Sequence, residues 1–380
     1  MRKSARILVV DDEAGMLRAV ERVLGGSHHV IASQSSSHAV AVATEFKPDL
    51  AILDVRMPEL DGFELMTRLK ADHPEMEIIL MTGSIDDLDQ KLIRAIRSHA
   101  FYFIQKPFDR EVLLTLVERC LELRWRREEN RRHVQRLEGQ LGEARAFQQG
   151  LLPANDFASD HLAISCRYVP CSELGGDLYD YASAGPRRTA LIIADVVGHG
   201  VSAAMLTGVV KSAFRASDVD GYEPAVVVRR VWRSLAAFGP DRFVTLVAAV
   251  VAPDEGCLSY VNAGHPTGLL WGEDRRLERL TSTGPLVSPA LEGTWDQRSV
   301  PLTVGDRLLL YTDGISDALA GDDDSGEEAM VAAVIEHAGG GAPLLDAILT
   351  RVRGRLGGRP QPDDLTLLTA KWCVDATIGT

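Results

Sequence analysis

Residues 194–200 read Ala-Asp-Val-Val-Gly-His-Gly, and this stretch decides the fold of the C-terminal half of the chain. It ends an apolar run over 188–195 that is typical of a buried strand, and it precedes a helical pattern over 201–216. Asp195 therefore stands where a strand ends and a helix begins. The neighbouring glycines allow the backbone to close around a ligand.

After Pro153 the sequence is rich in strand patterns. Further strands are predicted at 161–168, 243–251, 257–262, 268–271, 307–311 and 365–372, and further helices at 223–238, 327–337 and 343–356. Many strands with a few long helices between them indicate two sheets covered by helices. The sequence therefore predicts a layered α+β domain.

Four aspartates are expected at strand ends of this domain, most of them beside glycine. They are Asp177 in Gly-Gly-Asp-Leu-Tyr-Asp (175–180), Asp195, Asp313 in Tyr-Thr-Asp-Gly (311–314) and Asp363 in Asp-Asp-Leu-Thr (363–366). No nucleophilic serine or cysteine motif accompanies them, so metal-activated water is the expected nucleophile. Two cations would lower the pKa of a shared water to about 7 and favour displacement at phosphorus. The alternative is that these residues are solvated turn acids.

With these motifs, residues 148–372 resemble the metal-dependent PPM serine/threonine phosphatases, in particular the bacterial SpoIIE-like branch. The likeness extends to Gln-Gln-Gly-Leu-Leu-Pro at 148–153, Phe-Val-Thr-Leu at 243–246 and Tyr-Val-Asn-Ala-Gly-His-Pro at 260–266. It implies an αββα-layered domain over 152–375 with two Mn²⁺ or Mg²⁺ ions. By the same resemblance, the four aspartates are catalytic and Asp195 would bridge both ions. Asp177 and the Val196 carbonyl would serve one ion, and Asp313 and Asp363 would serve the other.

Some positions depart from the family or have two explanations. Val197 stands where the family often has a small residue, and residues 322–328 match poorly the Gly-Glu-x-Phe-Gly run that the family commonly has there. Both departures concern the rim of the site that would face the substrate. His199 is a candidate acid for the leaving seryl oxygen, or a structural residue at the helix entry. The remaining candidates, which can also be explained as capping or turn residues, are Asp180, Asp364 and His265.

The N-terminal half has a different sequence pattern, in which five strand–helix units follow one another. Strands are predicted at 6–10, 28–31, 50–53, 77–81 and 101–104, and helices at 13–24, 37–45, 63–73, 88–98 and 109–123. This order predicts a doubly wound, mainly parallel five-stranded sheet with its functional groups at the carboxyl ends of the strands.

Charged or hydroxyl side chains follow four of those strands. They are Asp11 and Asp12 after the first, Asp54 after the third, Thr82 after the fourth and Lys106 after the fifth. Clustered carboxylates repel one another unless a hard cation such as Mg²⁺ neutralises them. Lys106 and the Thr82 hydroxyl could then hold a phosphoryl group placed on Asp54.

Residues 4–123 thereby resemble the receiver domain of two-component response regulators. The matching motifs are Val-Val-Asp-Asp-Glu (9–13), Leu-Asp-Val-Arg-Met-Pro-Glu-Leu-Asp-Gly (53–62), Met-Thr-Gly (81–83) and Lys-Pro-Phe (106–108). The resemblance implies that Asp54 accepts a phosphoryl group, that Asp11, Asp12 and Asp54 bind Mg²⁺, and that Phe103 is the switch aromatic. A sensor histidine kinase or phosphotransfer protein is the implied partner.

Between the two domains, residues 116–151 carry a heptad seam. Its positions are Leu116, Cys120, Leu123, Arg127, Asn130, Val134, Leu137, Leu141, Ala144, Gln148 and Leu151. The pattern predicts a helical linker that pairs two chains as a coiled-coil homodimer, or a single helix that lies against a neighbouring domain.

Composition excludes several other classes. The 380 residues carry a formal net charge of −13, which argues against nucleic-acid binding. A DNA-binding regulator would need a basic helix-turn-helix after the receiver, and the acidic, strand-rich half does not fit one. No apolar run is long enough for a membrane span or signal peptide, so a cytoplasmic location is expected. Five scattered cysteines support neither a disulfide framework nor a zinc site.

The combination predicts a response regulator whose output is a metal-dependent phosphatase controlled by Asp54. The family implies a phosphorylated STAS-type anti-sigma-factor antagonist as substrate. The competing hypothesis is a binding adaptor that has lost its chemistry and sequesters a regulator when Asp54 is phosphorylated. All four metal acids are present, which favours the enzyme.

Overall fold

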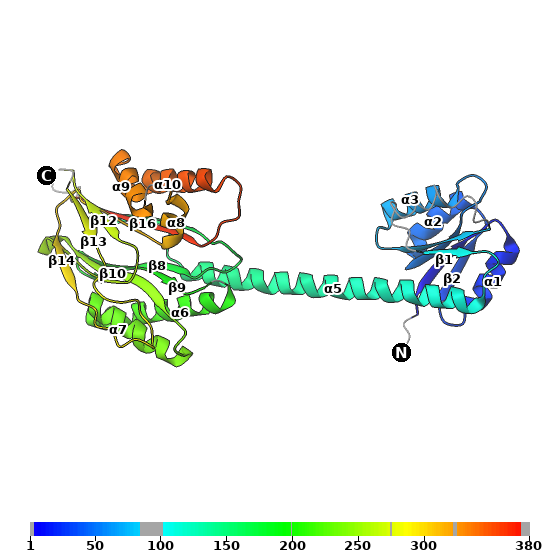
Figure 1. Ribbon diagram of the computed structural model, residues 1–380, viewed down its shortest axis with the longest axis horizontal. Coiled ribbons are helices and arrows are strands. Elements are labelled where there is room, and N and C mark those ends of the chain that lie inside the picture. Colours follow the sequence, from blue (N-terminus) through cyan, green and yellow to red (C-terminus); the bar gives the residue numbers. More distant parts are fainter. Residues whose placement is uncertain (1–3, 84–101, 199, 274–275, 322–324, 374–380) are drawn as a thin grey trace. The chain divides into compact units, whose positions relative to one another are not determined.

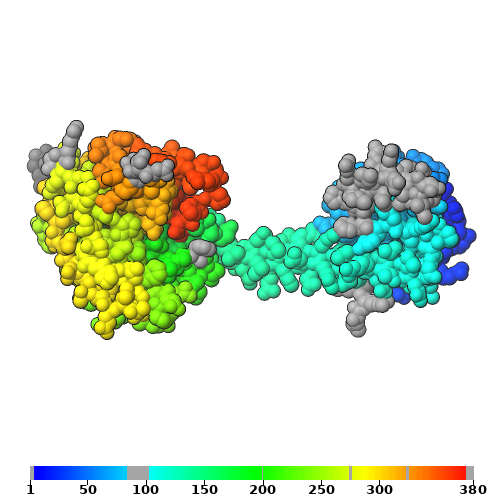
Figure 2. Space-filling model, in the orientation of Figure 1, coloured from blue at the N-terminus to red at the C-terminus, as the bar shows by residue number. Residues whose placement is uncertain are grey.

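A computed structural model describes residues 4–83, 102–198, 200–273, 276–321 and 325–373 (Figure 1). The chain forms two compact units, Met1–Leu137 and Glu138–Thr380. Each unit is built from one continuous stretch of chain, blue to cyan in the first and green to red in the second (Figure 2). Among the described residues, no helix combines the length and apolar character that crossing a membrane requires.

The N-terminal unit is a five-stranded parallel sheet in the order β2-β1-β3-β4-β5. Its strands are β1 (Arg6–Val10), β2 (His29–Ser33), β3 (Leu50–Asp54), β4 (Glu77–Thr82) and β5 (Tyr102–Gln105), and its helices are α1 (Ala14–Leu24), α2 (Ser36–Phe46), α3 (Gly62–Asp72) and the first part of α5 (Arg110–Leu151). One face of the sheet packs on α1 and α5, and the other on α2 and α3. The predicted doubly wound fold is confirmed, while the helix predicted at 88–98 lies outside the described residues.

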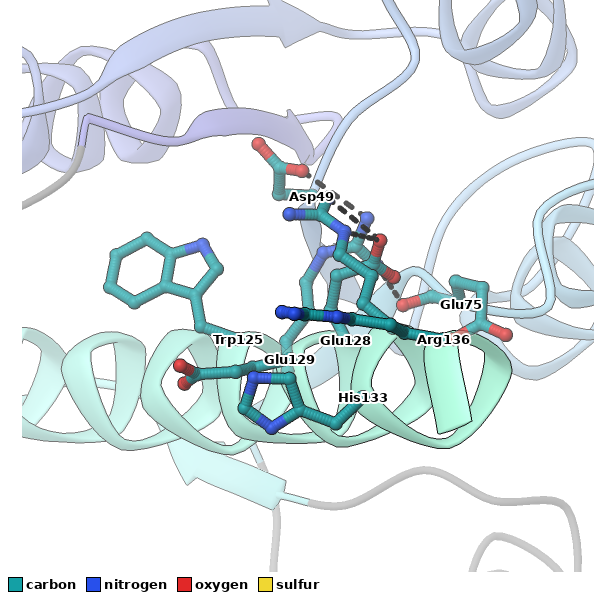
Figure 3. A pocket seen from close by; sticks show the side chains of 9 residues that line it. Asp49, Glu75, Trp125, Glu128, Glu129, His133 and Arg136 are labelled. Atoms are coloured by element: carbon teal, nitrogen blue, oxygen red, sulfur yellow. Dashed lines mark hydrogen bonds and ion pairs between the residues drawn. The ribbon is translucent and has the colours of Figure 1, made fainter. Parts of the chain in front are cut away.

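Helix α5 runs without interruption through the whole predicted linker, including Gly139 and Gly142. Near its middle, three arginines pair with acids at or just before the amino ends of strands in the N-terminal unit: Arg124 with Asp49 at 3.3 Å, Arg127 with Glu77 at 2.8 Å, and Arg131 with Glu75. Several of these side chains line the charged pocket of Figure 3. We call these three pairs the arginine ladder. It fixes this part of α5 at the sheet edge opposite the one where Asp54 lies.

The C-terminal unit contains two antiparallel sheets, in the orders β14-β11-β10-β9-β8 and β13-β12-β15-β16-β7-β6. The strands are β6 (Asp156–Ala158), β7 (Leu162–Val169), β8 (Asp177–Gly185), β9 (Arg188–Val196), β10 (Val244–Ala252), β11 (Cys257–Ala263), β12 (Gly268–Trp271), β13 (Leu277–Leu280), β14 (Arg298–Pro301), β15 (Arg307–Tyr311) and β16 (Leu365–Trp372). The helices are α6 (Val201–Arg215), α7 (Pro224–Leu235), α8 (Asp313–Leu319), α9 (Gly326–Glu336) and α10 (Gly341–Leu356).

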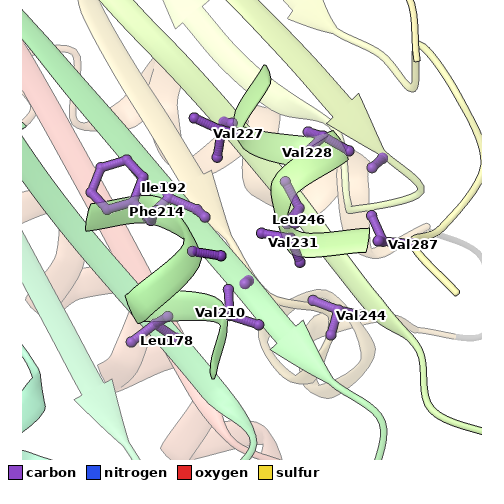
Figure 4. Close-up of a cluster of buried hydrophobic side chains, with 14 of the residues drawn as sticks. Leu178, Ile192, Val210, Phe214, Val227, Val228, Val231, Val244, Leu246 and Val287 are labelled. Atoms are coloured by element: carbon purple, nitrogen blue, oxygen red, sulfur yellow. The ribbon is translucent and has the colours of Figure 1, made fainter. Parts of the chain in front are cut away.

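Alternating side chains build four layers from these elements. Along β9, Ile192 points outward into a cluster with α6 and α7, which Figure 4 shows. The next residue, Ile193, points inward to the core between the two sheets. The outer face of the second sheet packs on α8, α9 and α10. This helix–sheet–sheet–helix order confirms the predicted layered domain.

The main difference from the sequence prediction is strand β8. The sequence placed residues 175–180 ahead of a strand, whereas β8 begins at Asp177 and pairs with β9 as a hairpin. Two aspartates and a glycine interrupt its hydrophobic pattern, which hides the strand from periodicity. The sequence also missed β6, β13, β14 and α8, because these elements are short or lack strong periodicity.

Candidate functional site

The N-terminal unit brings three carboxylates and a lysine together at the carboxyl edge of its sheet. Ligand oxygens of Asp11, Asp12 and Asp54 lie within 4.8 Å of one another. The Lys106 Nζ atom lies 2.6 Å from Asp11 Oδ2 and 2.9 Å from Asp54 Oδ1. Burial raises the pKa of Asp54, against the opposing effect of Lys106. Burial alone would lower the pKa of Lys106, but its hydrogen bonds to the two carboxylates outweigh this and raise it.

The other two receiver candidates lie on neighbouring strands. Thr82 is the last residue of β4 and is buried. Phe103 is half-buried in β5, and its ring centroid lies 6.5 Å from that of Phe63. The carboxylate set, with its hard oxygen donors, fits Mg²⁺.

In the C-terminal unit, Asp177 and Asp195 face each other across the β8–β9 hairpin. Asp177 is two residues from Tyr179 and Asp195 is two residues from Ile193, and both of these residues belong to the core between the sheets, so the two aspartates lie on the inner face. Asp177 Oδ2 accepts hydrogen bonds from the hydroxyls of Thr312 at 2.8 Å and Thr366 at 2.5 Å. Asp177 therefore joins the end of one sheet to the end of the other.

Asp313 and Asp363 bring further negative charge to the same place. Burial, followed by the charges of Asp313 and Asp363, raises the pKa of Asp195 to about 7. Burial and Asp195 raise the pKa of Asp177, and the two threonine hydroxyls oppose that rise. Burial, and then Asp363, raises the pKa of Asp313. Such mutual repulsion is relieved by divalent cations, so the donor set fits them.

Two glycines allow the backbone to approach the acids closely. A Cβ atom on Gly176 would lie 2.6 Å from the Val196 carbonyl oxygen, and one on Gly314 would lie 2.1 Å from the Asp364 carbonyl oxygen. No side chain fits at either position. This explains why glycine flanks both Asp177 and Asp313.

Two of the three additional candidates, Asp180 and Asp364, make contacts that stabilise the fold around the site. Asp180 lies on the opposite face of β8 from Asp177 and pairs with Lys211 at 2.7 Å and Arg215 at 2.5 Å. The Asp364 carboxylate accepts from the backbone N–H groups of Cys171 at 2.7 Å and Gly176 at 2.6 Å. Both acids hold the structure around the four aspartates.

His265 is buried, and its Nδ1 lies 2.8 Å from the Thr245 hydroxyl oxygen. Burial lowers the pKa of His265 to about 3, so the imidazole is neutral at physiological pH. His199 lies outside the described residues.

Sequence reasoning missed three polar side chains that contact the site. Thr312 and Thr366 stand inside quoted motifs, beside Asp313 and three residues after Asp363, and that proximity was the available signal. Gln148 was noted only as part of the heptad and the 148–153 motif.

Gln148 links the last turns of α5 to the loop before β8. Its buried amide donates from Nε2 to the Gly175 carbonyl at 2.7 Å and accepts at Oε1 from the Gly175 N–H at 3.3 Å. Nε2 also lies 3.4 Å from the Thr207 hydroxyl oxygen of α6. Because Gly175 is two residues from Asp177, a displacement of α5 would reach the acids through the backbone.

The raised pKa of Asp195 predicts how metal-free stability depends on pH. The folded state binds a proton more tightly than the unfolded state, whose ordinary value is 3.8, so stability should fall as pH rises from about 4 to about 7. Urea unfolding of the chelated full-length protein at pH 5 and pH 8, followed by tryptophan fluorescence, measures this. The slope should be flatter in Asp195→Asn, and stability that rises with pH would contradict the prediction.

Two family models match parts of the chain. The response regulator receiver domain model matches residues 7–118, and the model of stage II sporulation protein E (SpoIIE) matches residues 185–373. The phosphoserine phosphatase RsbP of Bacillus subtilis is 33% identical over 187 residues, which cover 48% of this chain and 46% of RsbP. The chain spans less than half the length of the first curated relatives it matches.

Two solved structures resemble the C-terminal unit. The SiaA-PP2C domain of Pseudomonas aeruginosa matches with a TM-score of 0.55 and 21% identity, over 63% of this chain and 98% of that one. The RsbU and RsbW domains of a Mycobacterium tuberculosis protein match with a TM-score of 0.50 and 25% identity, over 57% and 61% of the two chains. The first match shows the PP2C fold.

Proposed function

Because the chain contains a response regulator receiver domain and a SpoIIE-family PPM domain, we propose that it is a phosphorylation-controlled, metal-dependent phosphoserine/phosphothreonine phosphatase. The observation that carries this proposal is the convergence of Asp177, Asp195, Asp313 and Asp363: burial and neighbouring carboxylates raise the pKa values of the first three, and the charge of Asp363 contributes to the rise at Asp195 and Asp313. The relative RsbP is named a phosphoserine phosphatase, which supports hydrolysis of phosphoserine as the class of reaction.

The aspartates have the chemistry needed to hold two Mn²⁺ or Mg²⁺ ions. Asp195 pairs with Asp177 across the hairpin and also senses the charges of Asp313 and Asp363, which suits a bridging ligand. The Val196 carbonyl, close to Gly176, is the proposed backbone ligand. When bound, the two ions would supply Lewis-acid activation of a water and neutralisation of the phosphoryl oxygens. The protein contributes a fixed, partly buried donor set.

Control by Asp54 is proposed to act through α5. The arginine ladder attaches α5 to the receiver unit, and Gln148 attaches its other end to the loop before Asp177. A phosphoryl group on Asp54 would bias α5 between two positions, and a few kcal/mol of difference would shift most of the population. We propose that phosphorylation by a histidine kinase or phosphotransfer protein activates the enzyme.

The proposed substrate is a phosphorylated STAS-type anti-sigma-factor antagonist. This rests on relatives named RsbP and RsbU. The test measures release of phosphate, in Mn²⁺ and in EDTA, from a serine-phosphorylated STAS protein and from a phosphoserine peptide of the same sequence. Metal-dependent release with preference for the folded protein is expected. No release from either would contradict the phosphatase, and equal rates would contradict only the substrate.

The heptad seam carries a separate prediction about assembly. Val134 and Leu137 are 45% and 58% exposed on α5, so a second chain could cover them. The double variant Val134→Glu/Leu137→Glu is expected to shift sedimentation equilibrium from dimer to monomer, because charges would be buried in the seam. Gln135→Glu/Gln140→Glu, which changes exposed positions outside the seam, is the matched control. A parent chain that stays monomeric at all concentrations would contradict pairing.

A further inference from the structure

Two threonines of one sheet both contact the carboxylate of Asp177, which belongs to the other sheet. Thr312 follows β15 and Thr366 lies in β16, whereas Asp177 begins β8 in the other sheet. Both hydroxyls are fully buried, and both donate to the same oxygen, Asp177 Oδ2. The second oxygen of Asp177 receives neither bond.

We propose that Thr312 and Thr366 are positioning residues that reserve Asp177 Oδ1 for a metal ion or for a water held by that ion. This inference rests on the proposed metal-binding role of Asp177. The carboxylate of Asp177 would otherwise rotate about its Cβ–Cγ bond and offer either oxygen. With Oδ2 held by two donors, Oδ1 is the carboxylate oxygen that remains for the ion or its water.

The direction of the Thr312 bond follows from its other contacts. Its hydroxyl oxygen accepts from the Thr366 backbone N–H at 3.1 Å. A hydroxyl has one proton, and here that proton points to Asp177 Oδ2. The chain of donors therefore runs from the Thr366 backbone through Thr312 to the carboxylate, in one direction.

The N-terminus of α8 gives an independent reason to assign the Thr312 hydroxyl to the carboxylate of Asp177. Thr312 occupies the N-cap position of α8, where threonine ordinarily accepts a hydrogen bond from the first turn. Its side chain makes no such bond. The residue best placed to cap α8 instead donates to Asp177, so the helix start gives up a local stabilising contact.

The test compares variants that remove only the hydroxyl with variants that keep it. Thr312→Val and Thr366→Val keep the shape of the side chain and remove the donor, whereas Thr312→Ser and Thr366→Ser retain it. The matched control is Thr369→Val, in the same strand as Thr366, because the buried Thr369 hydroxyl donates to the Leu308 carbonyl at 2.9 Å and contacts no acid.

Isothermal titration of each full-length variant with Mn²⁺ is the primary readout. The valine variants are expected to bind Mn²⁺ about 10- to 100-fold more weakly, as loss of a ligand's hydrogen-bonding partner does in other metal sites. The serine variants and Thr369→Val should bind like the parent. At saturating Mn²⁺, the valine variants should recover most of their turnover, which a merely unfolded protein would not do.

The outcomes separate this inference from the proposed function. If Asp195→Asn binds Mn²⁺ as tightly as the parent, both the metal site and the positioning role are wrong. If Asp195→Asn loses binding but the valine variants match Thr369→Val, only the positioning role is wrong. Should Thr366→Val fail to fold by circular dichroism, Thr312→Val and the two serine variants still decide the result.

Discussion

Asp195→Asn is expected to lower metal-dependent phosphate release by about 10³-fold or more, because metal ions supply several kcal/mol of charge stabilisation and about 1.4 kcal/mol corresponds to a tenfold rate. Asp195 is central among the four acids: it faces Asp177 across the hairpin, and the charges of Asp313 and Asp363 raise its pKa. An asparagine keeps the size of the side chain and removes the charge. The measurement is phosphate release from a phosphoserine protein with Mn²⁺.

Loss of activity in this variant should come without loss of stability. In EDTA at pH 8, Asp195 is ionised against its neighbours, so its neutralisation should hold or raise the melting temperature. Asp313→Asn should also lose activity. Asp317→Asn is the matched control, since Asp317 is exposed one turn later on α8 and should retain the parental rate. A fully active Asp195→Asn protein would contradict the assigned site.

Under the proposed control, Asp54→Asn is expected to abolish phosphorylation of the N-terminal unit and, with it, the stimulation of phosphate release. The amide cannot form an acyl phosphate, yet Lys106 keeps its contact with Asp11, so the edge of the sheet should stay folded. Acetyl phosphate with Mg²⁺ should raise the parent's release of labelled phosphate from its substrate by about 5- to 150-fold, the usual range of coupling between two sites.

The control for this experiment is Asp72→Asn, which changes an exposed acid at the end of α3 and should respond like the parent. Two results would contradict the proposal. The first is a parent rate that acetyl phosphate leaves unchanged although mass spectrometry detects phosphorylation. The second is equal stimulation of the Asp54→Asn protein.

The sequence predicted the fold well where periodicity and length were strong. The parallel sheet, the long helix and the layered sandwich follow from buried runs such as 50–53 and from helices such as 201–216, whose structural bounds differ by a residue or two. Strand β8 was missed because its two aspartates break its hydrophobic pattern. Hydrophobic periodicity therefore fails to predict a strand in which polar side chains stand in place of hydrophobic ones.

The sequence pointed to the four candidate acids but not to the side chains that contact them. Strand-end aspartates beside glycine were visible in the sequence, and the structure brings Asp177 and Asp195 face to face. The partners of Asp177, by contrast, come from 135 and 189 residues away along the chain. Contacts at that separation depend on how two sheets stack, which no local spacing encodes. The same holds for Gln148 and its bonds to Gly175.

Asp177 and Asp180 belong to one strand and have opposite tasks, because three positions along a pleated strand reverse the direction of a side chain. A deletion of one residue between them would turn Asp180 to the same inner face as Asp177 and would leave Lys211 and Arg215 without their acidic partner. The segment between the two aspartates should therefore tolerate substitutions better than changes of length. Insertions and deletions should accumulate beyond Ser183, where the pairing with β9 already shifts in register.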